Sequence, residues 1–170
     1  KVSNPGTVSW IQLLEEKEFT KEINQLLNAG IDTFVCLRGE WSHEEYKTKY
    51  PELVDKTGKK VTFLHFPIDD FSTAEEQHNL VRKELASRVR QGSKIYIHCQ
   101  GGHGRTGLIA ISLLIALYGV GYQEAHKLIN QYHDCRKKCW DIGMNHMPEA
   151  DEQLYQIKEI EQSIKQEQFL

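Results

Sequence analysis

The stretch KIYIHCQGGHGRTGLIAISLLIALY, residues 94–118, decides the fold. Residues 94–98 form a short apolar run of the kind that predicts a buried strand. Glycine-rich residues 101–107 follow, and the apolar run from about Arg105 to Tyr118 is typical of a core helix. The stretch therefore predicts a strand that leads through a glycine-rich turn directly into a buried helix.

Two similar runs, rich in apolar and β-branched residues, lie upstream at 31–37 and 61–66 and predict two more strands. Helical patterns occur at 21–29, 72–90, 122–133 and 149–166. The helix at 72–90 connects two strands, and a connection of this length indicates a parallel pair. We therefore expect one α/β domain over residues 1–170, with a mainly parallel sheet of about four to five strands flanked by helices.

The composition is that of an ordinary globular chain, with 39% hydrophobic and 26% charged residues. A formal net charge of −3 supplies no basic field, so we expect no nucleic-acid partner. The apolar run that ends at Tyr118 is too short for a membrane span of about 20 residues, so we expect no span. We also expect a monomer.

The four cysteines, at positions 36, 99, 135 and 139, show no spacing of a disulfide framework. We therefore expect a reducing compartment, the cytoplasm or the nucleus. Cys135 and Cys139 have histidines nearby, but Cys-x3-Cys with scattered histidines is a weak zinc pattern. We interpret both residues as surface thiols and expect no bound metal and no organic cofactor.

The glycine-rich loop after the third strand has the composition of an anion-binding cup. Its glycines let successive backbone N–H groups point inward, and the helix that begins near Arg105 adds its dipole and its unpaired N–H groups. Cys99 lies at the base of this loop, where the same donors stabilise a thiolate. We therefore predict that Cys99 is a nucleophile below a phosphate site. The predicted lining residues are Gln100, Gly101, Gly102, His103, Gly104 and Arg105.

Three neighbours of Cys99 have predicted roles. Arg105 can place two N–H groups on phosphate oxygens, a task that lysine performs less well. Thr106 can donate its hydroxyl to the sulfur when the sulfur must leave, and His98 fixes the loop by hydrogen bonds. The alternative, a glycine-rich turn around an inert buried cysteine, would require all these residues to occur together by chance.

Asp69 and Asp70 are candidate general acids. They follow the strand run at 61–66 closely, and ligand-binding loops of open α/β sheets gather at the carboxyl ends of the strands. Either aspartate could face Cys99 and protonate a leaving oxygen. The alternative is a solvated turn in which Asp70 only caps the next helix.

Together these residues resemble the signature loop and the acid loop of cysteine-dependent protein phosphatases, over roughly residues 31–133. The resemblance implies a two-step reaction in which Cys99 attacks phosphorus, a cysteinyl-phosphate forms, and water hydrolyses it. Compact members of the dual-specificity type place the acid three residues after a proline, which selects Asp70 through Pro67. Phe66 stands where the tyrosine-specific members have tryptophan, so the resemblance favours the dual-specificity type.

Residues 34–41, together with residues 98–99 and 101–102, are additionally similar to the kinase-associated phosphatase that acts on cyclin-dependent kinases, which implies a phosphorylated protein substrate. The resemblance makes Cys36 a redox partner that forms a reversible disulfide with Cys99, although a small buried strand residue is an equal alternative. It also makes Gln153 a residue that positions water in the second step. Helix capping explains the segment around Gln153 without a function.

Other activities share such a loop. Sulfur transfer through a cysteine persulfide needs no neighbouring acid, so Asp69 and Asp70 argue against it. Phosphatases of inositol lipids favour lysines within the cup, which residues 100–105 lack, and an RNA 5′-phosphate presents the same dianion. A substrate-trapping phospho-binding module would not need an intact Cys99 and Asp70. The sequence favours a phosphatase of phosphotyrosine and phosphoserine/phosphothreonine in proteins, with a non-protein substrate or a binding module as the alternatives.

Overall fold

A computed structural model of the chain describes residues 16–39, 58, 60–70, 72–73, 75–134, 147–148 and 150–167. In chain order the elements are α1 (Glu16–Asn28), β1 (Thr33–Arg38), β2 (Thr62–Ile68), α3 (Glu75–Arg90), β3 (Ile95–His98), α4 (Gly104–Tyr118), α5 (Tyr122–His133) and α7 (Asp151–Glu167). Within these ranges no helix has the length and apolar character that crossing a membrane requires. Cys135 and Cys139, and part of the resemblance at 34–41, lie outside the described residues.

The three described strands form one parallel sheet in the order β2-β1-β3. Cys36 in β1 is level with His65 on β2 and with His98 on β3. This arrangement confirms the parallel pairing expected from the long helical connection. The described residues contain three strands rather than about four to five, because the expectation of further strands came from the fold class and not from additional β-branched runs.

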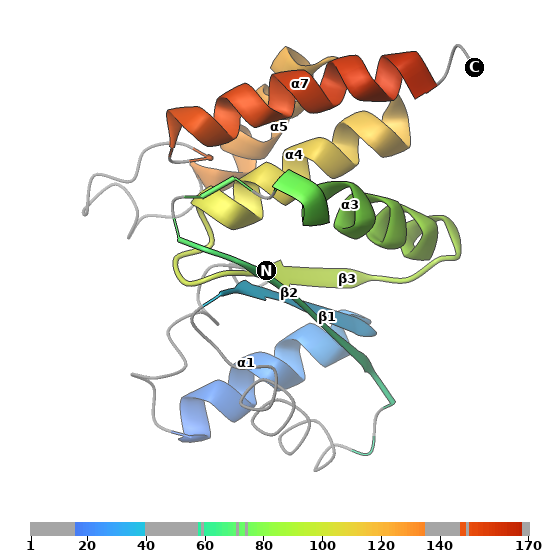
Figure 1. Ribbon diagram of the computed structural model, residues 1–170. Helices are drawn as coiled ribbons and strands as arrows, with labels where there is room; N and C mark the ends of the chain where they lie inside the picture. The colour runs from blue at the N-terminus through green and yellow to red at the C-terminus, as the bar shows by residue number, and fades with distance from the viewer. Residues whose placement is uncertain are drawn as a thin grey trace.

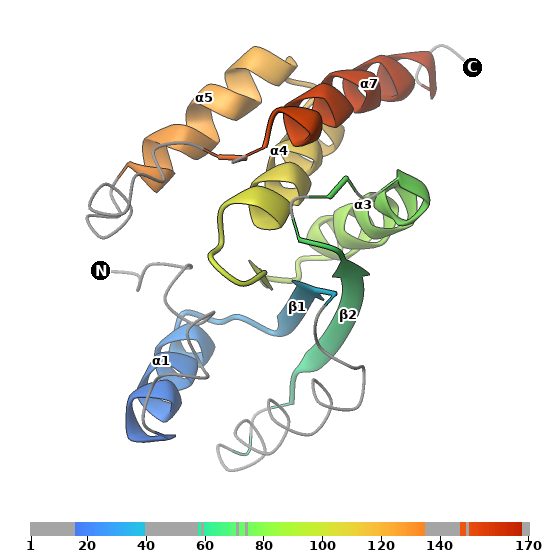
Figure 2. The same ribbon diagram turned by 60° about the vertical axis from the view of Figure 1, so that its left-hand side comes forward.

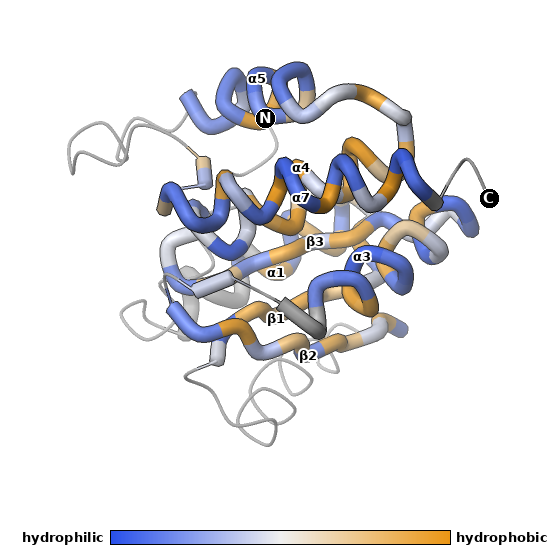
Figure 3. Tube along the Cα trace, turned by 45° about the horizontal axis from the view of Figure 1, so that its top comes forward, coloured by the Kyte–Doolittle hydropathy of each residue, from blue (hydrophilic) through white to orange (hydrophobic). Residues whose placement is uncertain are grey.

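Helices cover both faces of the sheet (Figure 1): α1 lies on one side, and α3, α4, α5 and α7 lie on the other. The side chains of β1 alternate between two buried clusters. Phe34 and Cys36 pack with α1, whereas Val35 and Leu37 pack with the helices of the opposite layer. Hydrophobic residues accordingly concentrate along the strands and on the inner sides of the helices (Figure 3). Because both faces are covered, β1 is buried along its whole length.

α4 connects the glycine-rich loop to the core. It packs against α3, α5 and α7, and side chains such as Leu108 and Ile111 are fully buried. The helix ends at Gly119, whose φ of 65° is left-handed and lets its N–H donate to the Ile115 carbonyl at 3.0 Å. The predicted core helix is therefore confirmed, and its position fixes the loop that precedes it.

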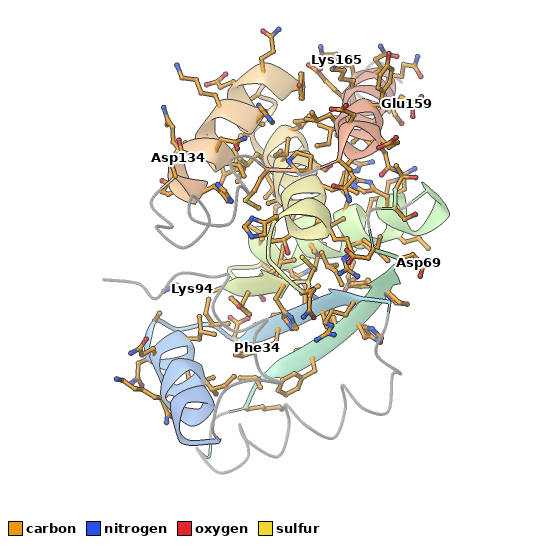
Figure 4. The ribbon with its side chains drawn as sticks, turned by 90° about the vertical axis from the view of Figure 1, so that its left-hand side faces the viewer. Phe34, Asp69, Lys94, Asp134, Glu159 and Lys165 are labelled. Carbon is orange, nitrogen blue, oxygen red and sulfur yellow. The ribbon has the colours of Figure 1, made fainter. Side chains whose placement is uncertain are left out.

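The carboxyl ends of β2 and β3 lie at the same edge of the parallel sheet. β2 continues to Ile68, beyond the predicted end at residue 66, because β2 is the outer strand of the described sheet and an outer strand tolerates Pro67. Figure 4 shows Asp69 just beyond β2, at the end opposite to Lys94, which precedes β3. The segment after β2 then passes the beginning of α4 before α3 starts (Figure 2).

Candidate active site

Cys99 follows β3 directly and is only 3% exposed. Its Sγ atom accepts hydrogen bonds from the backbone N–H of Gly102 at 3.2 Å and from the hydroxyl of Thr106 at 3.1 Å. Gly102 has a φ of 74°, a left-handed conformation that favours glycine. Two donors on one sulfur stabilise the negative charge of a thiolate. The contact expected between Thr106 and Cys99 is therefore present.

Arg105 is 1% exposed and connects the start of α4 to the end of β2. Its Nη1 donates to the backbone oxygen of Ile68 at 3.0 Å, and its Nη2 forms an ion pair with Oδ1 of Asp70 at 2.9 Å. One guanidinium thus joins the helix after Cys99 to the segment that carries the candidate acids. The strand order predicted this proximity.

The two candidate acids lie in different surroundings. Asp70 is half-exposed and paired with Arg105. Oδ1 of Asp69 lies 2.9 Å from the position that a Cβ on Gly39 would occupy, so Asp69 is directed toward the end of β1. Among the described contacts, Asp70 is therefore the candidate acid that is linked to the Cys99 loop, through its ion pair with Arg105.

His98 is buried at the end of β3, with 1% of its surface exposed. Its ring stacks on Tyr96, with ring centroids 5.6 Å apart. Burial lowers the pKa of His98 to about 3, and a backbone hydrogen bond at Cys99 only partly opposes this. His98 is therefore neutral at physiological pH, which suits a structural role in the loop better than proton transfer to substrate.

His103 belongs to the glycine-rich loop, but its side chain is buried against α5. Its Nδ1 lies 2.9 Å from Nε2 of His133, the last residue of α5, and the two rings meet edge to face. A Cβ at Gly101 would lie 2.7 Å from Cδ2 of His103, so the ring leaves no room for a side chain at position 101. Of the residues predicted to line the cup, Gln100 is exposed and residues 102–104 are buried.

Cys36 is fully buried in the cluster that faces α1, whereas Cys99 belongs to the cluster on the other side of the sheet. Burial raises the pKa of the Cys36 thiol to about 12. Both Cys36 and Cys99 are free thiols. The disulfide suggested by the resemblance is therefore not formed in this structure.

Gln153 lies in the first turn of α7 and is fully buried. Its Nε2 donates to the backbone oxygen of Ser72 at 3.2 Å, just after the candidate acids. The structure thus brings Gln153 to the same loop as Asp70, although the two residues are far apart in the sequence.

The start of α4 makes a further contact, with residues 147–148, that no sequence motif predicts. Asn130 of α5 bonds both backbone groups of Met147: its Nδ2 donates to the Met147 oxygen at 2.8 Å, and its Oδ1 accepts from the Met147 N–H at 2.7 Å. Met147 and Pro148 then pack on Gly107, where a Cβ would meet Met147 at 3.0 Å. No sequence signal marks Asn130, which is one polar residue among several on an amphipathic helix.

The described part of the chain contains no group of three or more His, Cys, Asp or Glu side chains that could hold a metal ion. It does contain a cysteine sulfur that accepts two hydrogen bonds, a buried arginine and a carboxyl group at one edge of the sheet. These groups suit nucleophilic attack on a tetrahedral oxyanion, followed by protonation of the group that leaves.

Comparison with known proteins identifies a family and several relatives. Residues 7–155 match the family described as PTP-SAK, Swiss Army Knife protein, DSP-PTPase phosphatase domain. The chain is 29% identical over 121 residues to "Putative tyrosine phosphatase 067L" of Invertebrate iridescent virus 3, covering 68% of this chain and 47% of that protein. It is 35% identical over 105 residues to "Cyclin-dependent kinase inhibitor 3" of Rattus norvegicus, covering 59% of this chain and 48% of that protein. The chain thus spans about half the length of these curated relatives.

Among solved structures, the chain is similar to that of kinase associated phosphatase with its catalytic-site cysteine changed to serine. The TM-score is 0.62 at 21% sequence identity, with 89% of this chain and 82% of the other chain covered. At this identity the likeness shows a shared fold, and it confirms the α/β architecture expected from the sequence.

Proposed function

The chain belongs to the PTP-SAK family of DSP-PTPase phosphatase domains and so to the protein-tyrosine and dual-specificity phosphatases, and on this premise we propose that it hydrolyses phosphate monoesters on tyrosine, serine and threonine side chains of proteins. One observation carries the proposal: Cys99 Sγ accepts two hydrogen bonds beside a loop where Arg105 and Asp70 meet at 2.9 Å. The proximity of these residues supports their proposed roles as nucleophile, phosphate ligand and acid.

In the first step, the Cys99 thiolate attacks the phosphorus of the substrate. A bond forms between Sγ and phosphorus, the bond from phosphorus to the ester oxygen breaks, and protonated Asp70 gives its proton to that oxygen. Backbone N–H groups of residues 100–104 and the guanidinium of Arg105 hold the equatorial phosphate oxygens. When the phosphate arrives, it takes the place of Asp70 at Arg105 Nη2, and the freed carboxylate takes up a proton from solvent before it acts as the acid.

In the second step, water attacks the cysteinyl-phosphate. Asp70, now a carboxylate, accepts a proton from the water, the bond between Sγ and phosphorus breaks, and inorganic phosphate leaves. The hydroxyl of Thr106, 3.1 Å from Sγ, stabilises the departing thiolate. The proton balance closes within Asp70, and no metal or organic cofactor takes part in either step.

A protein substrate suits the site because the cup residues Gln100–Gly104 carry no lysine for the extra phosphates of an inositol lipid. The name of one relative, "Putative tyrosine phosphatase 067L", also favours a phosphorylated protein substrate. Three features stay predictions: a reversible disulfide between Cys36 and Cys99, a monomeric state and a reducing compartment. Water placement by Gln153 stays an alternative role for that residue.

The test compares kcat/KM on phosphotyrosine and phosphothreonine peptides, inositol phospholipids and 5′-phosphorylated RNA, with Cys99→Ser as the inactive control. We expect hydrolysis of the peptides by the native chain and none by Cys99→Ser. A preference for the lipid or the RNA would replace the proposed substrate. Undiminished hydrolysis by Cys99→Ser would overturn the proposed chemistry.

A further inference from the structure

The acid loop, residues 69–72, is held at both of its ends by buried side chains. At its beginning, the backbone oxygen of Ile68 accepts from Nη1 of Arg105 at 3.0 Å and from the N–H of Gly39 at 3.1 Å. At its end, the backbone oxygen of Ser72 accepts from Nε2 of Gln153 at 3.2 Å. Asp70 lies between these two anchors.

The two anchors act on one tight turn. The N–H of Ser72 donates to the backbone oxygen of Asp69 at 3.1 Å, which closes a turn around Asp70. The contact of Gln153 with the Ser72 oxygen therefore lies two residues from Asp70 and at the residue that closes this turn.

Gln153 has a rigid base from which to hold that oxygen. It is fully buried in α7, and α7 packs along α4, the helix that begins with the residues around Arg105 (Figure 2). The anchor at each end of the acid loop thus belongs to the same pair of packed helices. Both anchors are therefore fixed by the packing of α4 on α7, and α4 also carries the Arg105 that pairs with Asp70.

Only one end of the Gln153 amide has a described partner. Oε1 of Gln153 is buried and has no hydrogen-bond partner among the described residues. A buried polar atom without a partner destabilises a fold, so this cost offsets part of what the hydrogen bond to Ser72 contributes to stability. The donor nitrogen is the part of the side chain that makes a contact, and its contact is with the acid loop.

We propose that Gln153 is a positioning residue for the general acid: through the Ser72 carbonyl it holds the acid loop so that Asp70 reaches the leaving oxygen. This inference rests on the proposed function. It differs from water placement, in which Gln153 would contact the attacking water of the second step.

The test uses Gln153→Met, which keeps the side-chain volume and removes the donor. The control is Ile157→Met, a change of a fully buried residue on the same helix that removes no hydrogen bond. Both are assayed on phenyl phosphate, whose leaving oxygen needs a proton, and on 2,4-dinitrophenyl phosphate, whose leaving oxygen does not. For Gln153→Met we expect kcat/KM to fall roughly 10²-fold on phenyl phosphate and little on the dinitrophenyl ester. For Ile157→Met we expect any change in kcat/KM to be the same on both esters.

A double-mutant cycle tests whether the effect passes through Asp70. In an Asp70→Asn background, Gln153→Met should cause no further loss on phenyl phosphate. Thermal unfolding of Gln153→Met should occur close to the native temperature, because the variant loses both the unpaired Oε1 and the hydrogen bond to Ser72, and these losses have opposite effects on stability. If Gln153→Met does not fold, Gln153→Asn, whose amide is one methylene too short to reach Ser72, replaces it in the same assays.

Equal losses on both esters would assign Gln153 a merely structural role. A burst of phenol followed by slow turnover would assign it to the second step, and unchanged kinetics would give it no role. Each of these results overturns the proposal while the proposed phosphatase function stands. Failure of the native chain to hydrolyse the dinitrophenyl ester would instead refute the proposed function, and the role of Gln153 with it.

Discussion

Replacing Thr106 by valine isolates one hydrogen bond in the proposed reaction. The two side chains have nearly the same shape, but valine lacks the hydroxyl that donates to Cys99 Sγ at 3.1 Å. In the first step the loss has two opposing effects, because the attacking thiolate is less stabilised but more reactive. In the second step there is no such cancellation, since negative charge builds up on the sulfur as it leaves phosphorus.

The size of the effect follows from the strength of a hydrogen bond to a charged atom, about 1.5–3 kcal/mol. One pKa unit, or one factor of ten in rate, corresponds to ~1.4 kcal/mol, so breakdown of the cysteinyl-phosphate should slow roughly 10- to 100-fold. The lower end is expected because Gly102 N–H still donates to the sulfur at 3.2 Å.

Rapid-quench kinetics with an aryl phosphate measures this directly. Thr106→Val should release a burst of the phenol equal to the enzyme concentration and then turn over slowly. Thr106→Ser, which keeps the hydroxyl, should behave like the native chain. The reasoning would be refuted if Thr106→Val showed neither a burst nor a lower kcat, or if the serine variant matched the valine variant.

Three further predictions concern the acid and the buried titratable groups. Asp70→Asn should lower kcat on a phosphothreonine peptide by roughly 10²- to 10⁴-fold, and native rates would exclude Asp70 as the acid. Burial lowers the pKa of His78 to about 4, so below pH ~6.5 the unfolded chain binds a proton that the folded chain does not, and acid destabilises the fold. His78→Gln should therefore weaken the fall in urea stability between pH ~6.5 and ~4, and an unchanged slope would contradict this assignment. Since the pKa of Cys36 is raised to about 12, iodoacetamide at neutral pH should alkylate Cys99 and spare Cys36 in peptide mass spectra; comparable alkylation of both would be the contrary result.

The sheet could be predicted because strands that are buried on both faces consist of nearly continuous apolar residues. The strands β1, β2 and β3 each coincide with an apolar, β-branched run, and the long helical connection indicates parallel pairing. Exact boundaries follow weaker signals. Thr20 has the side chain of a helix cap, yet α1 begins at Glu16 and continues through it, because residues of a capping type also occur inside helices.

Contacts between site residues that are close in the sequence could also be predicted. The glycines, Cys99, Arg105 and Thr106 lie within one loop and one helix turn, so their spacing alone brings the Thr106 hydroxyl to the sulfur. Asp70 required one more step, the rule that carboxyl ends of parallel strands share an edge. Its ion pair with Arg105 at 2.9 Å agrees with that expectation.

Contacts that depend on helix packing could not be predicted. His103 was expected to line the cup, but its ring lies 2.9 Å from His133 on α5, and no pattern links these two positions. The same holds for Gln153 and Ser72, which meet only because α7 packs on α4. Such pairings depend on rotations of whole helices, and a single sequence does not encode those angles in any local pattern.

The central claim is that phosphate passes through the sulfur of Cys99. The most direct measurement is acid quenching of the chain during turnover of a ³²P-labelled phosphopeptide, followed by identification of the labelled residue. The account predicts label on Cys99 as a cysteinyl-phosphate, more of it in Thr106→Val, and none in Cys99→Ser. Steady turnover without label on Cys99 in the slowed Thr106→Val variant, or turnover by Cys99→Ser, would contradict it.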